Sequence, residues 1–277
     1  DREMKRQKRI ALVNDITGFG RCSVTVELPL ISAMKIQACP LPTAILSVHT
    51  GFPDHYLDDY TERMVPYIAS WEKNGLAFDG ICTGFLGSAE QIAIVLDFIR
   101  RFKGAGTRVM VDPVMGDYGK LYPSYTQEMC DKMRSLLGVA DLVTPNLTEA
   151  CQLLDIPYPT DGIVTDDELC EMAEALAARG PKQVVITGLH EGDTIKNFLY
   201  EKGKIAIVRA PKIGGDRSGS GDAFAAIVAA SLIRGEELEA AVQKAASFIS
   251  RCLAYALELD LPWNYGLPFE EYLTELR

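Results

Sequence analysis

The sequence predicts an α/β fold with one mostly parallel central sheet and helices on both of its faces. Short apolar runs that end in Gly, Asp or Pro alternate along the chain with longer stretches of helical period. Runs such as 109–111 are apolar without alternation, which is typical of parallel strands buried on both faces. The 277 residues include no segment of linker composition, so a single domain is expected over residues 8–277, preceded by a basic N-terminal arm at 1–7.

The predicted elements follow this alternation in order. Strands are predicted from short β-rich runs at residues 10–13, 43–48, 80–83, 108–112, 141–144 and 184–187. Helices are predicted between them, from apolar residues at helical spacing, at residues 21–34, 57–73, 88–103, 124–137, 146–154 and 166–179. Strands 194–200 and 204–210 are expected to form a hairpin at one edge of the sheet. Helices 219–234 and 236–258 follow, and then a short helix after Pro268.

Composition and charge exclude several classes of protein. The 28 Lys and Arg residues are outnumbered by 38 Asp and Glu residues, and the net charge of −10 at pH 7 argues against a protein that binds duplex nucleic acid through basic groups. No apolar run is long enough to cross a bilayer. The seven cysteines are an odd number without a Cys-x-x-Cys pair, so reduced thiols in a cytoplasmic protein are expected.

The strongest chemical signal is the glycine-rich segment 213–224, which opens an Ala-rich helix. Its glycines let the backbone N–H groups of the first helical turn approach a ligand, which predicts an anion site. The carboxylate of Asp222 would repel a phosphate in a plain anion site, whereas a general base that faces an acceptor hydroxyl needs such a group. The structural alternative is a capped helix, in which Ser218 or Ser220 is the N-cap and Asp222 interacts with the helix dipole.

Two further polar motifs come directly after predicted strands, where the ligands of parallel sheets bind. Asp112 and Asp117 follow the fourth predicted strand and are candidate ligands for Mg²⁺ beside a nucleotide, although Asp-Pro and Gly-Asp are also ordinary turn dipeptides. Asn146 and Glu149 follow the fifth predicted strand and have the spacing of a capping box. They are therefore either a helix cap or additional polar groups near the metal.

Residues 14–23 contain part of the dinucleotide-binding fingerprint, but the sequence does not favour that function. Gly18 and Gly20 are followed by Ser23 where the fingerprint requires a third glycine, and no acidic residue ends the next strand. A P-loop is excluded because the chain contains no Gly-x-x-x-x-Gly-Lys-Ser/Thr stretch.

Three motifs in this order and spacing resemble those of the ribokinase-like superfamily, and within it those of the pyridoxal kinase group. They are Asp112-Pro113-Val114-Met115-Gly116, Thr144-Pro145-Asn146-Leu147-Thr148-Glu149 and Gly219-Ser220-Gly221-Asp222. Segments 46–52 and 83–88 also look like the substrate-side loops of that group, so the resemblance covers roughly residues 8–255. It implies a ribokinase-like three-layer sandwich and phosphorylation, with MgATP, of the 5′-hydroxymethyl group of pyridoxal, pyridoxine or pyridoxamine.

The resemblance also implies roles for individual residues. The implied catalytic groups are Asp222 as general base and, as an anion hole, the backbone N–H groups of Gly219, Ser220 and Gly221. The residues implied for ATP, besides Gly219 and Gly221, are Asp112, Asp117, Asn146, Glu149 and Thr187. The residues implied for metal ions are Asp112 and Glu149 for Mg²⁺ and Thr144 for a monovalent cation such as K⁺. The residues implied for the vitamin are Asp15, Thr50, Phe85 and Asp222.

The expected partners are small molecules, ATP and a B6 vitamer, with no nucleic acid and no membrane. The resemblance implies a homodimer. The Gly and Tyr content of residues 117–123 suits a flap over ATP.

Two positions depart from most pyridoxal kinases and leave the ring preference open. Asp15 stands where a serine is common, and Phe85 stands where a tyrosine is common. A carboxylate at position 15 is able to pair with a protonated pyridine nitrogen, but acids in this loop also bind sugar hydroxyls in other branches of the superfamily. The alternatives are therefore a hydroxymethylpyrimidine or sugar kinase of the same fold and, from another class, a nucleotide-binding protein without catalysis.

Overall fold

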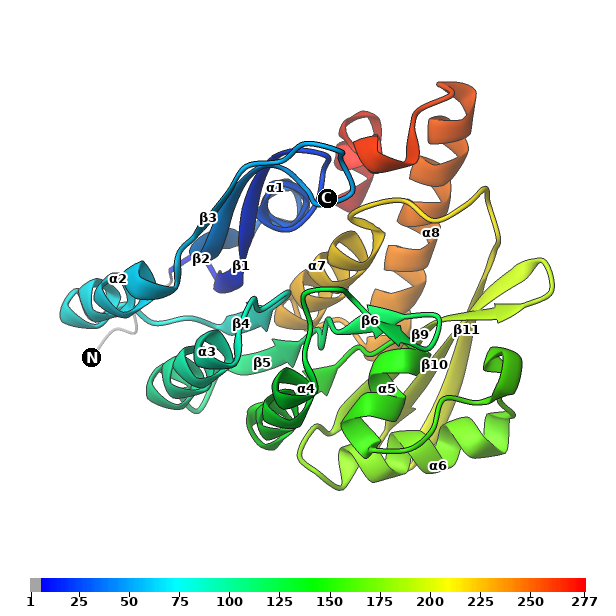
Figure 1. Cartoon of the computed structure of the whole chain (residues 1–277), viewed down its shortest axis with the longest axis horizontal. Coiled ribbons are helices and arrows are strands. Elements are labelled where there is room, and N and C mark those ends of the chain that lie inside the picture. The colour runs from blue at the N-terminus through cyan, green and yellow to red at the C-terminus, as the bar shows by residue number, and fades with distance from the viewer. Residues whose placement is uncertain (1–5) are drawn as a thin grey trace.

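A central sheet with helices on both faces forms the body of the chain, as the sequence predicts (Figure 1). The computed structural model describes residues 6–277, so most of the expected arm at 1–7 lies outside the described residues. The strands are β1 (Arg9–Phe19), β2 (Gln37–Val48), β3 (Leu57–Asp59), β4 (Gly80–Thr83), β5 (Arg108–Val111), β6 (Gly116–Asp117), β7 (Lys120–Leu121), β8 (Leu142–Val143), β9 (Gln183–Glu191), β10 (Thr194–Glu201) and β11 (Lys204–Pro211).

The helices alternate with these strands. The α-helices are α1 (Val24–Ala33), α2 (Thr61–Lys73), α3 (Ala89–Phe102), α4 (Gln127–Met133), α5 (Leu147–Leu154), α6 (Asp166–Ala177), α7 (Ser220–Ile233) and α8 (Leu238–Glu258). The 3₁₀ helices are η1 (Arg134–Val139), η2 (Thr160–Gly162), η3 (Trp263–Tyr265) and η4 (Glu270–Leu276). Within residues 6–277, none of the helices combines the length and the apolar character that a bilayer crossing requires.

The strand order in the main sheet is β11-β10-β9-β8-β5-β4-β1-β2-β3. The strands from β9 to β2 in this order are parallel to one another, whereas β10 and β11 at one edge and β3 at the other pair antiparallel. The carboxyl ends of β1, β4, β5, β8 and β9 therefore meet at one end of the sheet. This end is where the polar motifs of the sequence come together.

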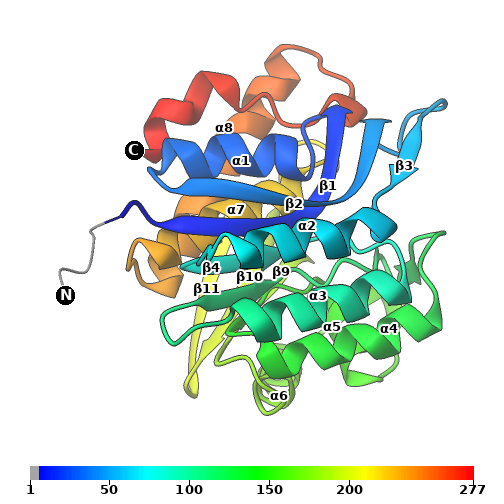
Figure 2. The same ribbon diagram turned by 90° about the vertical axis from the view of Figure 1, so that its left-hand side faces the viewer.

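Two apolar layers hold the helices on the sheet (Figure 2). Successive side chains of β1 point to opposite faces, so Ala11 and Val13 pack under α2–α6 while Ile10 and Leu12 pack under α1, α7 and α8. All four side chains are fully buried. The Ala-rich α7 lies in the second layer, and its N-terminus projects toward the carboxyl end of the sheet.

The start of β2 was predicted too late because of its prolines. The strand begins at Gln37 rather than at residue 43, and it contains Pro40 and Pro42, which have no backbone N–H to donate. The N–H of Gln37 donates to Lys8 O, so the nitrogens at 40 and 42 point away from β1. On the side away from β1, β2 pairs with β3 only at residues 44–46. The two prolines therefore cost the sheet no hydrogen bond, because no neighbouring strand lies opposite their nitrogens.

Other predicted boundaries were also wrong. The strand predicted at 10–13 continues to Phe19, because β1 pairs with β2 as far as Val48, so much of the predicted first loop, residues 14–23, is strand. The helix predicted from residue 57 begins at Thr61, because residues 57–59 form the edge strand β3 instead. The helix predicted over 124–137 divides into α4 and the 3₁₀ helix η1. β9 runs beyond residue 187, because pairing with β10 extends it to Glu191.

Candidate active site

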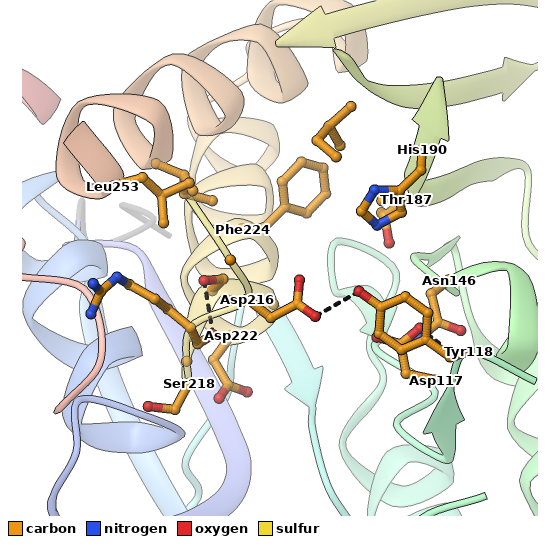
Figure 3. A pocket seen from close by; sticks show the side chains of 18 of the residues that line it. Asp117, Tyr118, Asn146, Thr187, His190, Asp216, Ser218, Asp222, Phe224 and Leu253 are labelled. Carbon is orange, nitrogen blue, oxygen red and sulfur yellow. Dashed lines mark hydrogen bonds between the residues drawn. The ribbon is translucent and has the colours of Figure 1, made fainter. Parts of the chain in front are cut away.

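A cavity of about 740 Å³ lies beyond the carboxyl ends of β5, β8 and β9 (Figure 3). On one side it is bounded by the glycine-rich loop before α7, and Asp222 lies at the base of this side. On the opposite side are polar residues that follow the strands, among them Asp117 and Asn146. Apolar side chains of α7 and α8, including Phe224 and Leu253, line a further part of the wall. One end of the cavity is thus polar and the other apolar.

Most of the predicted site residues line this one cavity. They are Asp112, Asp117, Thr144, Asn146, Glu149, Thr187, Gly219, Ser220, Gly221 and Asp222. Asp15 is adjacent, since the hydroxyl of Ser23 donates to Asp15 Oδ1 (2.8 Å) while the N–H of Ser23 donates to Asp222 Oδ2 (2.8 Å). Thr50 and Phe85 do not line the cavity: Thr50 is exposed in a turn, and the ring of Phe85 lies 6.4 Å from that of Tyr125. Their roles stay predictions.

The N-terminus of α7 is open toward the cavity. Gly219 is the N-cap with a φ of 79°, and a Cβ at this position would overlap the carbonyl oxygen of Arg21. The hydroxyl of Ser220 donates to Arg217 O (3.0 Å), and that of Ser218 points to Gly20 O (3.3 Å), so neither serine caps the helix. The structure contradicts the capped-helix alternative. The N–H groups of the first turn, which lack partners inside the helix, border the cavity instead.

Asp222 combines burial with two hydrogen-bond donors. The N–H of Ser23 lies 2.8 Å from its Oδ2, and Nδ2 of Asn14 lies 3.4 Å from its Oδ1. The pKa of Asp222 is raised to about 6: burial is the largest cause, the charge of Asp15 adds to the rise, and the two hydrogen bonds oppose it. A carboxylate whose pKa lies near neutrality is well suited to accept a proton from an alcohol.

Asn146 and Glu149 form the predicted capping box and also bound the cavity. Glu149 Oε1 accepts from the N–H of Asn146 (2.9 Å), and Glu149 Oε2 accepts from the N–H of Met115 (2.9 Å). The amide of Asn146 accepts from the N–H of Glu149 (2.9 Å) and donates to Gly116 O (2.8 Å). The predicted cap of α5 is therefore confirmed, and the same two side chains also hold the loop after β5 at the cavity wall; their role near a metal stays a prediction.

The buried acidic groups around the cavity form no ion pairs within residues 6–277. Burial, followed by the charges of Glu149 and Asp222, raises the pKa of Asp112 well above its usual range, and burial raises that of Glu149 to about 8. Within residues 6–277, no salt bridge involves Asp112, Glu149 or Asp222. A cation would relieve this repulsion.

The donor set fits Mg²⁺ that arrives with a phosphate rather than a metal held by protein alone. In the part of the chain that the structure describes, no three His, Cys, Asp or Glu side chains converge as metal ligands. Mg²⁺ commonly uses one or two carboxylates, completing its shell with water and phosphate oxygens. Asp112, with Glu149 beside it, supplies that number of carboxylates at the cavity wall.

Sequence reasoning missed four polar residues at or next to the cavity. The hydroxyl of Tyr118, in the turn between β6 and β7, donates to Asp216 Oδ2 (2.6 Å) of the glycine-rich loop (Figure 3). No sequence pattern joins these two positions, and only the fold brings them together. Asn14 and Glu27 lie behind Asp222, and both are almost fully buried. The sequence does distinguish Glu27, because it is a carboxyl group among the apolar residues of a predicted helix.

Comparisons with known proteins find relatives of two neighbouring activities. The family model for phosphomethylpyrimidine kinase matches residues 27–264. A hydroxymethylpyrimidine/phosphomethylpyrimidine kinase of Haemophilus influenzae is 32% identical over 193 residues, which cover 68% of this chain and 69% of the relative. The pyridoxal kinase PdxY of Leifsonia xyli is 25% identical over 264 residues, which cover 90% of each chain. A Bacteroides thetaiotaomicron protein, assigned as a phosphomethylpyrimidine kinase and crystallised with pyridoxal, is 39% identical, covers 98% of this chain and 96% of its own, and superposes with a TM-score of 0.93.

The free energy of unfolding should depend on pH in a way that reveals the raised pKa of the buried Glu149. Its pKa is raised in the folded protein, so its contribution to the free energy of unfolding is fully present below the usual value of 4.5 and is lost as the pH rises through about 8. Glu149→Gln should therefore flatten the decline of that free energy between these pH values, as measured by urea denaturation. Glu168→Gln is the matched control, because it changes the equivalent capping box on the exposed start of α6. Equal slopes in wild type and Glu149→Gln would contradict the prediction.

Proposed function

The chain belongs to the phosphomethylpyrimidine kinase family, and from this premise we propose that it transfers the γ-phosphoryl group of ATP to the 5′-hydroxymethyl group of pyridoxal, pyridoxine or pyridoxamine. The observation that carries the proposal is the position of Asp222, which faces Asp112 and Glu149 within a single cavity. The relative from Bacteroides thetaiotaomicron, crystallised with pyridoxal, supports a B6 vitamer as the acceptor.

Asp222 acts on the acceptor side of the transfer. The hydroxyl oxygen of the vitamer attacks the γ-phosphorus, the new O–P bond forms, and the bond from the γ-phosphorus to the bridging oxygen breaks to release ADP. Asp222 takes the proton of the hydroxyl, which later passes to solvent. A positioned base of this kind contributes about 10²- to 10⁴-fold to the rate.

The other side of the cavity binds and stabilises the phosphates. The backbone N–H groups of Gly219, Ser220 and Gly221 donate hydrogen bonds to the phosphoryl oxygens, on which negative charge develops during the transfer. Lys120 and Lys212 also line the cavity, and within residues 6–277 neither forms a salt bridge, so both ammonium groups are available to phosphate oxygens.

The residues proposed to hold metal ions lie on the phosphate-binding side of the cavity. Mg²⁺, when bound with the nucleotide, supplies positive charge at the phosphates, and Asp112 and Glu149 are the residues that would hold it. Thr144, whose hydroxyl hydrogen-bonds to Asp112, stays the candidate for the monovalent cation.

The apolar end of the cavity suits a nucleobase. Phe224, Ile249 and Leu253 present apolar side chains there, and Thr187 lies between them and the polar end. In this arrangement the nucleobase of ATP contacts helices α7 and α8, and the phosphates lie at the start of α7. The acceptor alcohol lies beyond Asp222. The hydrogen bond between Tyr118 and Asp216 joins two separate parts of the cavity wall.

A hydroxymethylpyrimidine kinase is the second candidate. The observation that favours it is the 32% identity to the Haemophilus influenzae kinase, and that relative has the higher identity of the two curated relatives compared above. Both acceptors carry a hydroxymethyl group on a nitrogen heterocycle, so the same base and anion hole serve either one. Asp15 and Phe85 are the positions at which a ring preference is expected to be decided.

A coupled assay of ADP release with a panel of alcohols tests the proposal. The panel contains pyridoxal, pyridoxine, pyridoxamine, hydroxymethylpyrimidine and ribose, each with MgATP. The highest kcat/KM is expected with a B6 vitamer. A higher value with hydroxymethylpyrimidine supports the second candidate, and ATP binding without ADP release on any of these alcohols points to a nucleotide-binding protein without catalysis.

Asp222→Asn should lower kcat by about 10²- to 10⁴-fold, because the amide cannot accept the proton of the alcohol. The affinity for ATP, measured by calorimetry, should change little. In the wild type, kcat/KM should fall as the pH is lowered through about 6, since Asp222 of the free enzyme then takes up a proton before the substrate arrives. Near-normal turnover of Asp222→Asn would refute the role of this residue.

Tyr118→Phe should speed the entry of ATP. The hydrogen bond from Tyr118 to Asp216 joins two parts of the cavity wall, and a hydrogen bond of this kind contributes about 1 kcal/mol, so its loss should raise the association rate constant about fivefold. Stopped-flow fluorescence with a labelled ATP analogue measures this rate. Tyr122→Phe, in the same hairpin region, is the control because its hydroxyl makes no hydrogen bond among the described residues. An unchanged rate in Tyr118→Phe would show that the contact does not limit entry.

A further inference from the structure

A buried carboxyl group that the mechanism does not use lies directly behind the base. Glu27, on α1, is only 5% exposed. Its Oε1 accepts a hydrogen bond from Nδ2 of Asn14, at 2.5 Å. A carboxyl group is costly to bury, and it persists at such a position only where its hydrogen bonds are made. The side chain that it contacts is the one that also approaches Asp222.

Asn14 connects Glu27 to the base. It is 1% exposed and lies in β1 where the register with β2 shifts, a local irregularity that changes the direction of side chains. Its Nδ2 lies 3.4 Å from Asp222 Oδ1, and its Oδ1 accepts from the N–H of Asp15 (3.0 Å). The facing residue is Gly84, where a Cβ would overlap the amide of Asn14. The amide is therefore held in place on every side.

We infer that Glu27 is a positioning residue for the transfer: it fixes the amide of Asn14, and this amide, together with the N–H of Ser23, sets the direction of the Asp222 carboxylate. The inference rests on the proposed role of Asp222 as the base. The two donors approach different oxygens of Asp222, so they orient the carboxylate in its plane. Removal of one donor allows the group to rotate, and a misplacement of about 1 Å costs about 10²-fold in rate.

The charges around Glu27 indicate that it works as a neutral group. Its neighbours include Asp222 and Asp15, and its charge also acts on Cys82 and Asp112, all of them groups that disfavour a second negative charge. Burial, followed by the charge of Asp222, raises the pKa of Glu27 well above its usual range. A neutral carboxyl group presents a carbonyl oxygen to Asn14, and the amide of a glutamine presents the same oxygen at the same distance along the side chain.

Two substitutions separate positioning from a structural role. Glu27→Met removes the acceptor while nearly preserving the volume, and it should lower kcat by about 10- to 100-fold and leave the KM for ATP within about twofold. Tm should fall only by the loss of one buried hydrogen bond, since the amide of Asn14 is left without its acceptor, and the protein should stay folded in the assay. Glu27→Gln keeps the acceptor and should retain kcat within about threefold. Ser231→Ala is the control, since it changes a fully buried hydroxyl without a partner on the helix that carries Asp222.

A double-mutant cycle tests whether Glu27 acts through Asn14. The kcat of Glu27→Met/Asn14→Ala should be no lower than that of Asn14→Ala alone. Additive losses, or a kcat for Glu27→Met equal to that of the wild type, would overturn the inference. A loss of kcat that Glu27→Gln shares would do the same, because it would mean that the acceptor oxygen is not what matters.

A readout without substrate keeps this inference separate from the proposed function. The side-chain amide protons of Asn14 are measured by NMR hydrogen exchange in the free protein, with Asn14→Ala as the assignment control. Their protection should persist in Glu27→Gln and fall at least tenfold in Glu27→Met. If the protein phosphorylates none of the alcohols, the proposed function fails while this measurement still decides whether Glu27 fixes Asn14; equal protection in both variants overturns the inference by itself.

Discussion

The repulsion among carboxyl groups that share the carboxyl end of one sheet is the constraint on which the site depends. Asp112, Glu149 and Asp222 come from three different elements, and within residues 6–277 no salt bridge neutralises them. Such a cluster costs stability, which the apolar layers on both faces of the sheet must offset. The uncompensated negative charge explains why the cavity favours cations. Burial is the main cause of the raised pKa of each of these groups, and the charges of Glu149 and Asp222 add to it for Asp112.

The two loops next to Asp222 are joined by residues near the end of the chain. Backbone carbonyls of residues 261–265 accept from Arg217 (2.7 Å to Leu261 O) and from Arg21 (3.0 Å to Tyr265 O). The segment thereby ties the loop before α7 to the loop before α1. Gly219 completes the contact, since its missing Cβ lets the two backbones meet. The base and the backbone N–H groups next to it are thus placed by residues distant in sequence from all three motifs.

The sequence predicted the layers and the sheet type because these follow from local patterns, and it predicted ten residues of the cavity wall from such patterns together with the family resemblance. Apolar runs report buried parallel strands, and polar residues directly after them must lie at the carboxyl ends. The contact between Tyr118 and Asp216 was not predictable, since it depends on how two loops meet in space. The prolines of β2 concealed its start, because the side on which a strand lacks a partner is a property of the sheet and not of the strand. Glu27 could have been recognised as an anomaly, but its partner Asn14 could not.

The division of the site between sheet and loops explains why one fold accompanies two activities among its relatives. The groups proposed to serve phosphoryl transfer, Asp222 and the start of α7, are fixed by packing on the sheet and by the loop before α1. Two of the positions expected to read the ring of the acceptor, Thr50 and Phe85, lie in loops after β2 and β4 and outside the wall of the cavity, whereas the third, Asp15, lies on β1 next to Asp222. A change in those loops alters which alcohol is placed before Asp222 without disturbing the base or the anion hole. Reaction type is therefore the more constrained property of this architecture, and acceptor identity the more variable one.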